Sequence, residues 1–329
     1  MLIRLLFLIS ILSGCTAKQV IYSGGSVAAD HLFASEAGVR ILKEGGNAVD
    51  AAVATSFTLS VVRPFSCGIG GGGFMVIAPK DGAFVALNYR ETAPEIVGPS
   101  FYENHNSRVG PDAVGVPGTV AGLLSAHEKY GKLPLSQVMA PAIEIAKGGF
   151  VPDSAYRAGV ESAKRALNKV SMELQDRATA MTRFEIDKEL ILPGQARVLE
   201  KIAQHGIVGF YGGDVANAIV ASTEGHISHN DLATYSPRWE KPLVVDVGGG
   251  FTIVSMPPPS SGGIALAQIL SLMQRLGATE LDRDDPLYSH LLIESMKHVF
   301  ADRAEHLADA AFVDVPIEKL IDPAYLDEL

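Results

Sequence analysis

After its first two dozen residues, the sequence shows apolar residues at helical spacing that predict two consecutive helices. In the first helix the apolar positions recur three and four residues apart, at Phe33, Ala34, Ala37 and Ile41. Gly45-Gly46 ends that pattern, and Asn47 is typical of the N-cap of a second helix, from Ala48 to about Val62. Because this second helix is apolar on nearly every side, with Asp50 as its one charged residue, we expect it in the protein interior.

A glycine run and two short apolar stretches predict a β-hairpin next. The run spans Gly68 to Gly73 and leads into the apolar stretches Phe74 to Ala78 and Ala83 to Tyr89. The Lys-Asp-Gly sequence between the two stretches is typical of a tight turn. Because side chains alternate along a strand, we expect Arg90 at the far end of the second strand, on the same face as Asn88.

From residue 118 onward the pattern is mainly helical and is interrupted by two strands. Helices are expected at 118–130, 134–148, 154–176, 193–205, 213–223, 264–276 and 286–307, with a helical turn at 230–235 and a last helix near residue 329. Strands are expected at Leu243 to Val247 and Phe251 to Ser255, with three glycines between them. Ser260 or Ser261 is expected to cap the helix that follows. Without internal repeats or low-complexity linkers, the sequence favours one unit from residue 15 to residue 329.

Composition and charge narrow the class of protein. Of the 329 residues, 47% are hydrophobic and 19% are charged, a balance that is typical of a folded chain rather than a disordered one. The formal net charge is -10 and no basic block stands out, which argues against binding to nucleic acid. We therefore expect a folded acidic protein with no nucleic-acid partner.

The glycine run contains the spacing Gly68-x-Gly70-x-x-Gly73, which is known from dinucleotide-binding loops. That motif works between a strand and a helix whose N-terminus receives the pyrophosphate. Here a helix precedes the run and a strand follows it, so we expect no dinucleotide cofactor. The glycines instead indicate a backbone that needs positive φ or the close approach of another group.

The first fifteen residues have the pattern of an export signal. Residues 1–14 hold Arg4 and then an apolar run that is too short to span a membrane, which needs roughly 20 apolar residues. Leu12-Ser13-Gly14-Cys15 resembles the lipobox of bacterial lipoproteins, which implies a lipid on Cys15 that anchors the protein to a membrane. An ordinary secretory signal is the alternative. Both interpretations imply an exported protein, periplasmic or at the cell surface.

We expect neither a metal site nor a standard nucleophile motif. His226 and His229 are close in the sequence but lack a third ligand. There is no G-x-S-x-G motif, and no Ser-His-Asp set can be assigned. Cys67 is interpreted as a small buried residue rather than a redox centre.

Arg90 is the strongest candidate binding residue. It lies in the sequence Asn88-Tyr89-Arg90-Glu91-Thr92-Ala93-Pro94, where a strand ends beside the glycine run. A guanidinium in such a place can bind a carboxylate through two parallel charge-assisted hydrogen bonds. The alternative is a structural ion pair with Glu91 or Glu95.

Six motifs, taken in order, resemble those of the γ-glutamyltranspeptidases and the related cephalosporin acylases. They are Gly45 to Ala54, Gly68 to Phe74, Arg90 to Pro94, Val116 to Gly122, Met256 to Gly263 and Ala301 to Arg303. The ordered set is specific, and the resemblance extends from about Val20 to the end of the sequence. It implies an α/β fold of layered helices and sheets, the αββα sandwich of the N-terminal nucleophile hydrolases, of which this chain is the large-subunit region. That sandwich is incomplete without the small-subunit part.

The resemblance also implies a mechanism and partners. Family members cleave themselves into a large and a small subunit, and the new N-terminal Thr of the small subunit attacks the γ-amide of glutathione or a related γ-glutamyl compound. Backbone amides hold the oxyanion, and water, an amino acid or a peptide then accepts the γ-glutamyl group. In this scheme Arg90 contacts the substrate α-carboxylate and orients the amide, and no cofactor takes part.

One departure from the family pattern concerns the nucleophile. The Thr-Thr-His processing motif does not occur in the 329 residues, and no threonine follows Thr279. We therefore expect a large-subunit portion that stops before the catalytic threonine and is inactive in isolation, so no catalytic residue is assigned in this chain. Two alternatives stay open, a cephalosporin or glutaryl acylase of the same fold and a catalytically inactive lipoprotein fragment.

Overall fold

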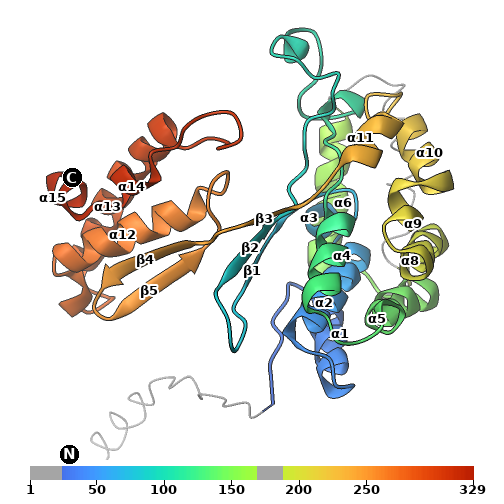
Figure 1. Ribbon diagram of the computed structural model, residues 1–329, viewed down its shortest axis with the longest axis horizontal. Coiled ribbons are helices and arrows are strands. Elements are labelled where there is room, and N and C mark those ends of the chain that lie inside the picture. The colour runs from blue at the N-terminus through green and yellow to red at the C-terminus, as the bar shows by residue number, and fades with distance from the viewer. Residues whose placement is uncertain (1–23, 169–187) are drawn as a thin grey trace, which may run out of the picture.

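Two bodies joined by an extended segment make up the described chain. The computed structural model describes residues 24–168 and 188–329, so the predicted signal peptide at 1–14 and Cys15 lie outside the described residues. Elements between residues 32 and 240 form the first lobe, and elements from residue 243 onward form the second lobe (Figure 1). The chain passes from one lobe to the other between strands β3 (Arg238–Glu240) and β4 (Leu243–Gly248).

The first lobe is built around helix α2 (Ala48–Val62), which is largely buried, as its apolar sequence predicts. Helices α1 (Leu32–Lys43), α4 (Thr119–Tyr130) and α5 (Leu135–Gly148) pack against it, and all four helices confirm the predictions. The lobe also contains α3 (Pro64–Cys67), α6 (Ser154–Leu167), α8 (Pro193–His205), α9 (Val208–Tyr211), α10 (Gly213–Ser222), α11 (His229–Thr234) and the 3-10 turns η1 (Phe101–Glu103) and η2 (Pro111–Ala113). Of the helix predicted over 154–176, α6 is observed with Asn168 as its C-cap, and residues 169–176 lie outside the described residues.

The buried carboxylate of Asp50 determines where α2 begins. Asn47 and Asp50 form a capping box, in which each side chain accepts a hydrogen bond from the backbone N–H of the other. The same carboxylate accepts the backbone N–H of Lys132, at 3.0 and 3.1 Å from its two oxygens. Because a buried carboxylate needs such donors, Asp50 also ties α2 to the turn between α4 and α5.

A three-stranded antiparallel sheet lies beside these helices, in the order β1-β2-β3. Strands β1 (Phe74–Ile77) and β2 (Val85–Asn88) confirm the predicted hairpin. Strand β3 was not predicted, and it pairs with β2 on the other side, so that β2 becomes the central and most buried strand. Asn88 Nδ2 donates a hydrogen bond to Glu240 Oε1 at 3.1 Å across this pair.

The second lobe is a two-stranded sheet with helices on one face. Strands β4 and β5 (Phe251–Ser255) pair antiparallel as predicted, and the three glycines at their turn all have positive φ, of 85°, 62° and 79°. The other elements are α12 (Gly262–Arg275), η3 (Ala278–Glu280), α13 (Pro286–His306), α14 (Ile317–Leu320) and α15 (Pro323–Glu328). Leu243, Val245 and Val247 of β4 are buried, and this strand packs against α12, while Val244 and Asp246 between them are exposed. One face of this sheet is therefore covered by helix and the other is open.

A buried Asp302 holds the helices of the second lobe together. Its carboxylate accepts hydrogen bonds from Gln268 Nε2 at 2.7 Å and from the Tyr325 hydroxyl at 2.6 Å. The hydrogen bond to this carboxylate, with some burial, raises the pKa of Tyr325 to about 12. The predicted capping of α12 by a serine hydroxyl is wrong, because the Ser261 backbone is already helical and its Oγ accepts a hydrogen bond from Arg303 Nε at 3.1 Å instead.

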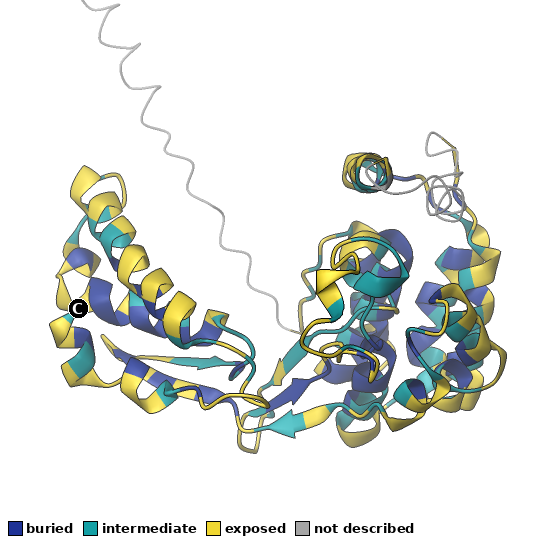
Figure 2. Ribbon diagram, turned by 90° about the horizontal axis from the view of Figure 1, so that it is seen from above, coloured by how far each residue is buried: buried dark blue, intermediate teal, exposed yellow. Residues whose placement is uncertain are grey.

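Each lobe has its own core. Four clusters of buried apolar side chains occur in the described residues, and none of them combines residues of both lobes (Figure 2). The largest cluster surrounds α2. Within the described ranges, no helix is long and apolar enough to cross a membrane.

Arg63, the C-cap residue of α2, has a buried side chain that forms ion pairs with two partly exposed aspartates of the first lobe. Its side chain is 8% exposed, and Nε lies 3.0 Å from Asp30 Oδ2. The two terminal nitrogens donate to the two oxygens of Asp153, the N-cap residue of α6, at 3.0 and 2.5 Å. The hydrogen bonds from Arg63 are the largest cause that lowers the pKa of the Asp153 carboxyl. The network joins the end of α2 to the start of α6.

We predict that Arg63→Met lowers the free energy of unfolding by about 1–3 kcal/mol, because it removes the hydrogen bonds of the buried guanidinium to two aspartates and to the carbonyl oxygens of Val62 and Asp30. The measurement is urea denaturation of the chain. The matched control is Arg40→Met, since Arg40 forms exposed ion pairs with Glu44 and Glu144 and its loss should change stability by less than about 1 kcal/mol. Equal losses in the two variants would contradict the assignment.

The same network predicts a dependence on pH. Because the folded-state pKa of Asp153 is lowered, its contribution is fully present above the unfolded-state pKa and is lost as pH falls through the folded-state value. We expect Arg63→Met to lose less stability than the wild type when the pH is lowered from 6 to about 3. Parallel pH profiles for the two proteins would contradict this prediction.

Candidate functional site

Arg90 lies two residues after Asn88, the last residue of β2, and hydrogen bonds hold its backbone N–H and its carbonyl oxygen. Its N–H donates to Asn88 Oδ1 at 3.1 Å, and its carbonyl oxygen accepts the Tyr235 hydroxyl at 2.9 Å. Its side chain is 58% exposed, and the guanidinium carbon lies 5.6 Å from the centre of the Phe74 ring. The structure thus confirms the predicted place of Arg90 at the end of the strand.

Within the protein, the guanidinium of Arg90 has only one weak partner, the carboxylate of Glu91, among the described residues. The ion pair with Glu91 was the structural alternative, and Nε lies 3.7 Å from Glu91 Oε2, which is beyond hydrogen-bond distance. Over the part of the chain that the structure describes, no other ion pair and no hydrogen bond of this guanidinium is found. A planar cation with free terminal N–H groups is suited to bind a carboxylate in two-point fashion.

Tyr89, the residue before Arg90, is the centre of the packing at this point. Its N–H and carbonyl oxygen exchange hydrogen bonds with Gly73, at 2.9 and 3.1 Å. An added Cβ would lie 2.8 Å from the Tyr89 ring at Gly73, 2.1 Å from the ring at Gly122, and 2.1 Å from the Tyr89 carbonyl oxygen at Gly118. Burial raises the pKa of Tyr89 to about 12. We call Gly73, Gly118 and Gly122 the glycine cradle of Tyr89.

The glycine run explains how β2 and α4 come together. The carbonyl oxygen of Gly71 accepts the N–H groups of Gly118 and Thr119, at 2.8 and 2.9 Å. A Cβ at Gly72 would lie 2.5 Å from the Tyr89 carbonyl oxygen. None of the glycines from 68 to 73 has positive φ, so of the two reasons expected for the run, the close approach of another backbone is the one observed.

Two tyrosines that the sequence did not single out support the backbone near Arg90. The rings of Tyr211 and Tyr235 are stacked, with centroids 6.0 Å apart and planes at 3°. The Tyr211 hydroxyl donates to the carbonyl oxygen of Pro117 at 2.6 Å, while Tyr235 bonds to Arg90. Burial is the largest cause that raises the pKa of each hydroxyl, so both stay protonated donors. They bridge α9, the segment before α4 and the end of β2.

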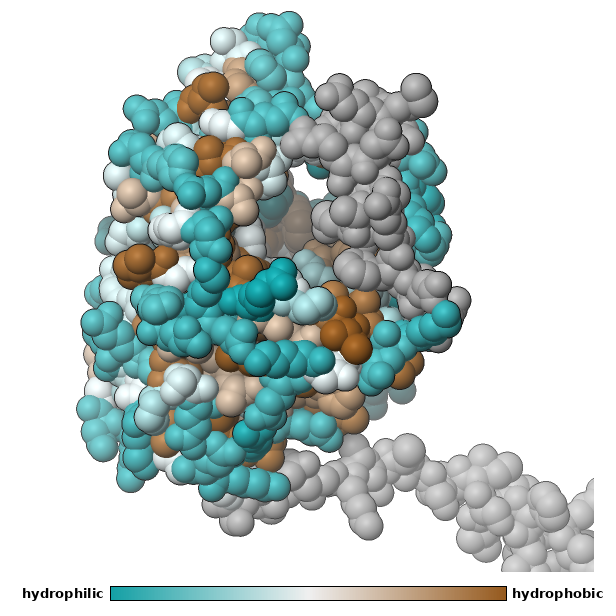
Figure 3. All heavy atoms as spheres, turned by 90° about the vertical axis from the view of Figure 1, so that its right-hand side faces the viewer, coloured by the Kyte–Doolittle hydropathy of each residue, from teal (hydrophilic) through white to brown (hydrophobic). Residues whose placement is uncertain are grey.

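Two cavities lie near this region, and Arg90 lines neither of them. A cavity of about 440 Å³ is bounded by the segment after Arg90 and by α11, including Thr92, Glu95 and Asp231. A larger one of about 670 Å³ lies between the glycine run and helices α8 to α10, on the side where Figure 3 shows apolar side chains among hydrophilic ones. The lining of this larger cavity is mainly apolar but includes Arg197 and Lys201, of which Lys201 is paired with Asp214. We take the exposed guanidinium of Arg90 as the candidate binding site, because it lies just after β2 with its terminal donors free.

Other residues considered from the sequence lie elsewhere. His226 and His229 do not come together, because His229 Nε2 lies 2.7 Å from Asn217 Oδ1 and His226 points to a different segment. The sequence predicts that Cys67 is a buried residue. In the structure it is the last residue of the short helix α3 and is only half-buried. The glycine run follows helix α3 and leads into β1, which is the reverse of the strand–loop–helix order of a dinucleotide-binding motif.

Comparison with known proteins gives consistent results. The γ-glutamyltranspeptidase family model matches residues 34–329. The chain is 41% identical over 318 residues to a glutathione hydrolase proenzyme of Pseudomonas aeruginosa, covering 93% of this chain and 56% of that protein. It is 35% identical over 346 residues to an acylase ACY 1 proenzyme of a Pseudomonas species, covering 95% of this chain and 59% of that protein. The chain thus spans about half the length of the curated relatives it matches.

Solved structures show the same likeness in three dimensions. The crystal structure of Helicobacter pylori γ-glutamyltranspeptidase matches with a TM-score of 0.85 and 36% identity, covering 94% of this chain and 92% of that chain. The predicted fold class, a layered α/β fold of the N-terminal nucleophile hydrolase type, is therefore confirmed. The role of Arg90 stays a prediction.

The glycine cradle gives a test of this packing. Gly122→Ala should lower the free energy of unfolding by about 1–3 kcal/mol, because the new methyl overlaps the ring of Tyr89. Gly194→Ala is the matched control, since Gly194 is also helical but has no atom within 4 Å of the added Cβ. Replacing a helical glycine with alanine favours the helix by about 1 kcal/mol in both variants. Without a steric clash, the stability of Gly194→Ala should therefore equal or exceed that of the wild type. Urea denaturation measures both, and a similar shift in the two variants would refute the cradle.

Proposed function

The chain belongs to the γ-glutamyltranspeptidase family, and from this premise we propose that it is the large-subunit portion of an enzyme that hydrolyses or transfers γ-glutamyl groups. Glutathione and related γ-glutamyl compounds are the proposed donors. The observation that carries the proposal is the exposed guanidinium of Arg90, held at the end of β2 with its terminal donors free. Names of relatives as glutathione hydrolase proenzymes support the same activity.

In this proposal Arg90 binds the α-carboxylate of the γ-glutamyl group. Asn88 accepts the N–H of Arg90 and Tyr235 donates to its carbonyl oxygen, so the position of the Arg90 backbone is fixed. The exposed side chain can still change its rotamer to meet the carboxylate. Two parallel N–H···O bonds to the carboxylate would orient the γ-amide toward the nucleophile. Such positioning lowers the entropic part of the barrier.

We further propose that a small-subunit portion supplies the nucleophile and completes the fold. An αββα sandwich requires each sheet to pack on another sheet, and the second lobe has a sheet with one open face. Strands β4 and β5 and helices α12 and α13 also expose large apolar side chains: Val244, Phe251, Leu266, Leu270, Ile293 and Phe300. Surfaces of this kind mark sites where another polypeptide packs.

In the proposed assembled enzyme, the N-terminal threonine of the small subunit carries out the chemistry. The hydroxyl of this threonine attacks the γ-carbonyl, and the threonine amine takes the proton. The amine of the leaving group departs with a proton, and a γ-glutamyl ester remains on the threonine oxygen. Water then releases glutamate, or the amino group of an amino acid or peptide takes the γ-glutamyl group. No cofactor enters this sequence.

A second candidate function is acylase activity on β-lactam side chains. The 35% identity to an acylase proenzyme favours keeping it, and a glutaryl group carries a carboxylate that Arg90 would also bind. Rates of the assembled enzyme on γ-glutamyl anilide and on glutaryl-cephalosporin distinguish the two functions. If neither substrate is turned over, the remaining interpretation is an inactive lipoprotein fragment.

We also propose that the protein is exported and anchored to a membrane by a lipid on Cys15. The support is the sequence of residues 1–15, which lies outside the described residues. A single lipid chain gives reversible attachment, and additional chains make it stable. The membrane anchoring proposed here therefore depends on this one cysteine, whereas export to the periplasm or cell surface follows from either kind of signal.

If Arg90 binds the substrate carboxylate through two hydrogen bonds, a lysine that keeps the positive charge should not restore substrate affinity. In the assembled enzyme, Arg90→Lys should raise KM for a γ-glutamyl anilide by about 10-fold or more, because the ammonium cannot form both parallel bonds. Steady-state kinetics measures this change. Arg238→Lys is the matched control, since Arg238 is an exposed arginine of the neighbouring strand that lies near Glu240, and its KM should stay within about two-fold.

A substrate variant completes that experiment. With the α-carboxylate converted to an amide, the wild type and Arg90→Lys should have similar KM values, because the group that distinguishes them is gone. An unchanged KM for Arg90→Lys on the ordinary substrate would exclude the carboxylate role while leaving the enzyme class open.

The lipid proposal predicts that Cys15→Ser abolishes incorporation of labelled palmitate and moves the protein from the membrane to the soluble fraction. Growth with labelled palmitate, followed by fractionation, measures both. Cys67→Ser serves as the control and should keep the label, because Cys67 lies in the folded first lobe. Export without any label in the wild type would indicate an ordinary secretory signal instead.

A further inference from the structure

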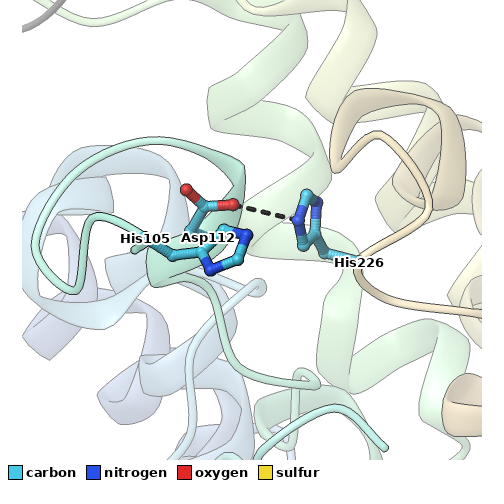
Figure 4. Close-up of side chains that lie close together, drawn as sticks. All are labelled: His105, Asp112 and His226. Carbon is cyan, nitrogen blue, oxygen red and sulfur yellow. Dashed lines mark ion pairs between the residues drawn. The ribbon is translucent and has the colours of Figure 1, made fainter. Parts of the chain in front are cut away.

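Three potential metal ligands that are distant in the sequence converge on one side of the first lobe. His105 follows η1, Asp112 belongs to η2, and His226 lies in the turn between α10 and α11. One ligand atom from each lies within 4.8 Å of the others. Figure 4 shows the Asp112 carboxylate directed at the His226 ring, with His105 beside them.

Contacts with backbone carbonyl oxygens indicate that both histidines would offer Nε2 to a metal ion. His105 Nδ1 lies 2.7 Å from the carbonyl oxygen of Phe101, and His226 Nδ1 lies 2.9 Å from that of Thr223. A carbonyl oxygen can only accept, so each Nδ1 carries its hydrogen and donates it. The neutral ring then presents the lone pair of Nε2. Histidines that bind a metal typically donate their other ring N–H in this way.

His226 and Asp112 lie close enough together to bind one cation. His226 Nε2 lies 2.9 Å from Asp112 Oδ1. With the ring hydrogen on Nδ1, both atoms offer lone pairs that a metal cation can accept. His105 is the third member of the cluster, and its ligand atom lies within 4.8 Å of both.

We propose that His105, Asp112 and His226 bind a divalent transition-metal ion of the zinc type. Two imidazole nitrogens and one carboxylate oxygen form a donor set that suits Zn²⁺, with water in the fourth position. Metal–ligand distances of about 2.0–2.2 Å place tetrahedral ligand atoms roughly 3.3–3.5 Å apart. On binding, the 2.9 Å between His226 Nε2 and Asp112 Oδ1 therefore widens slightly, and the His105 ligand atom, within 4.8 Å of both, adjusts to the same spacing. His105 is exposed and has room to move, while His226 and Asp112 are only 19% and 22% exposed.

Neighbouring side chains hold the ligands in place. The Phe101 ring stacks on the His105 ring, with centroids 4.0 Å apart and planes at 4°. It also packs edge-on against the His226 ring, with centroids 6.0 Å apart and planes at 78°. The Tyr102 hydroxyl donates to the backbone oxygen of Asp112 at 3.2 Å. These contacts order the segment from residue 101 to residue 113, so little of it has to be rearranged when an ion binds.

The ion would join two segments that also pack together through the buried side chains of Val116 and Ile227. One is the excursion between β2 and α4 that carries η1 and η2, and the other is the turn before α11. Helix α11 contributes Asp231, whose Oδ1 accepts the backbone N–H of Glu95 at 2.9 Å, on the segment that follows Arg90. The site is therefore structural in character, and the inference holds whether or not the proposed enzymatic function is correct.

The test is zinc binding to the full chain, freed of any tag and stripped with a chelator. Titration against a chromophoric chelator should show one Zn²⁺ per chain, Co²⁺ should give the intense visible absorption of a tetrahedral site, and Zn²⁺ should raise the Tm. His105→Gln, His226→Gln and Asp112→Asn should each weaken Zn²⁺ binding by about 10-fold or more. His229→Gln is the control, because His229 lies outside the cluster and bonds to Asn217.

Because His105 is exposed, its replacement should leave the fold intact, so a loss of Zn²⁺ binding in that variant reports on the site itself. His105→Gln should keep the metal-free Tm of the wild type but lose the Zn²⁺-dependent rise. The proposal is overturned by a wild-type chain that binds no stoichiometric Zn²⁺ or Co²⁺, which would leave an imidazolium–carboxylate pair. It is equally overturned if His105→Gln binds Zn²⁺ as well as the wild type, or if His229→Gln weakens binding as much as His226→Gln.

Discussion

The backbone around Tyr89 is the constraint on which the candidate site depends. Three glycines approach this buried tyrosine so closely that a methyl group at any of them would overlap its ring or its carbonyl oxygen. The glycine run, the end of β2 and the start of α4 can therefore share one small volume. Arg90 is the next residue, and its position is a consequence of that packing rather than of any contact made by its own side chain.

Two arginines illustrate how the surroundings decide the role of a side chain. Arg63 is buried and bonded to two aspartates, so its donors are used within the protein and its contribution is to stability. Arg90 has an anchored backbone and an exposed, weakly paired guanidinium, so its donors are available to a ligand. Both follow apolar segments in the sequence, and the difference depends on what the fold brings near each of them.

The sequence predicted the parts of the structure that depend on local signals. Helix α2 begins and ends where its cap and apolar pattern indicate, and both hairpins were predicted from apolar runs around glycines. Strand β3 was missed because its three residues are defined by pairing with β2, far away in the sequence. The supporting tyrosines and the His105–Asp112–His226 cluster were missed for the same reason, since their partners are brought together by the tertiary fold. Ser261 had the right residue type for a cap, but the backbone there is already helical.

The separate cores of the two lobes have a consequence for synthesis on the ribosome. The first lobe is complete at β3, whose residues are followed by those of the second lobe. Translation proceeds at ~5–20 residues per second, and N-terminal units fold first. The first lobe can therefore acquire its core while the second is still emerging. The apolar surface of the second lobe then appears beside a first lobe that has already folded.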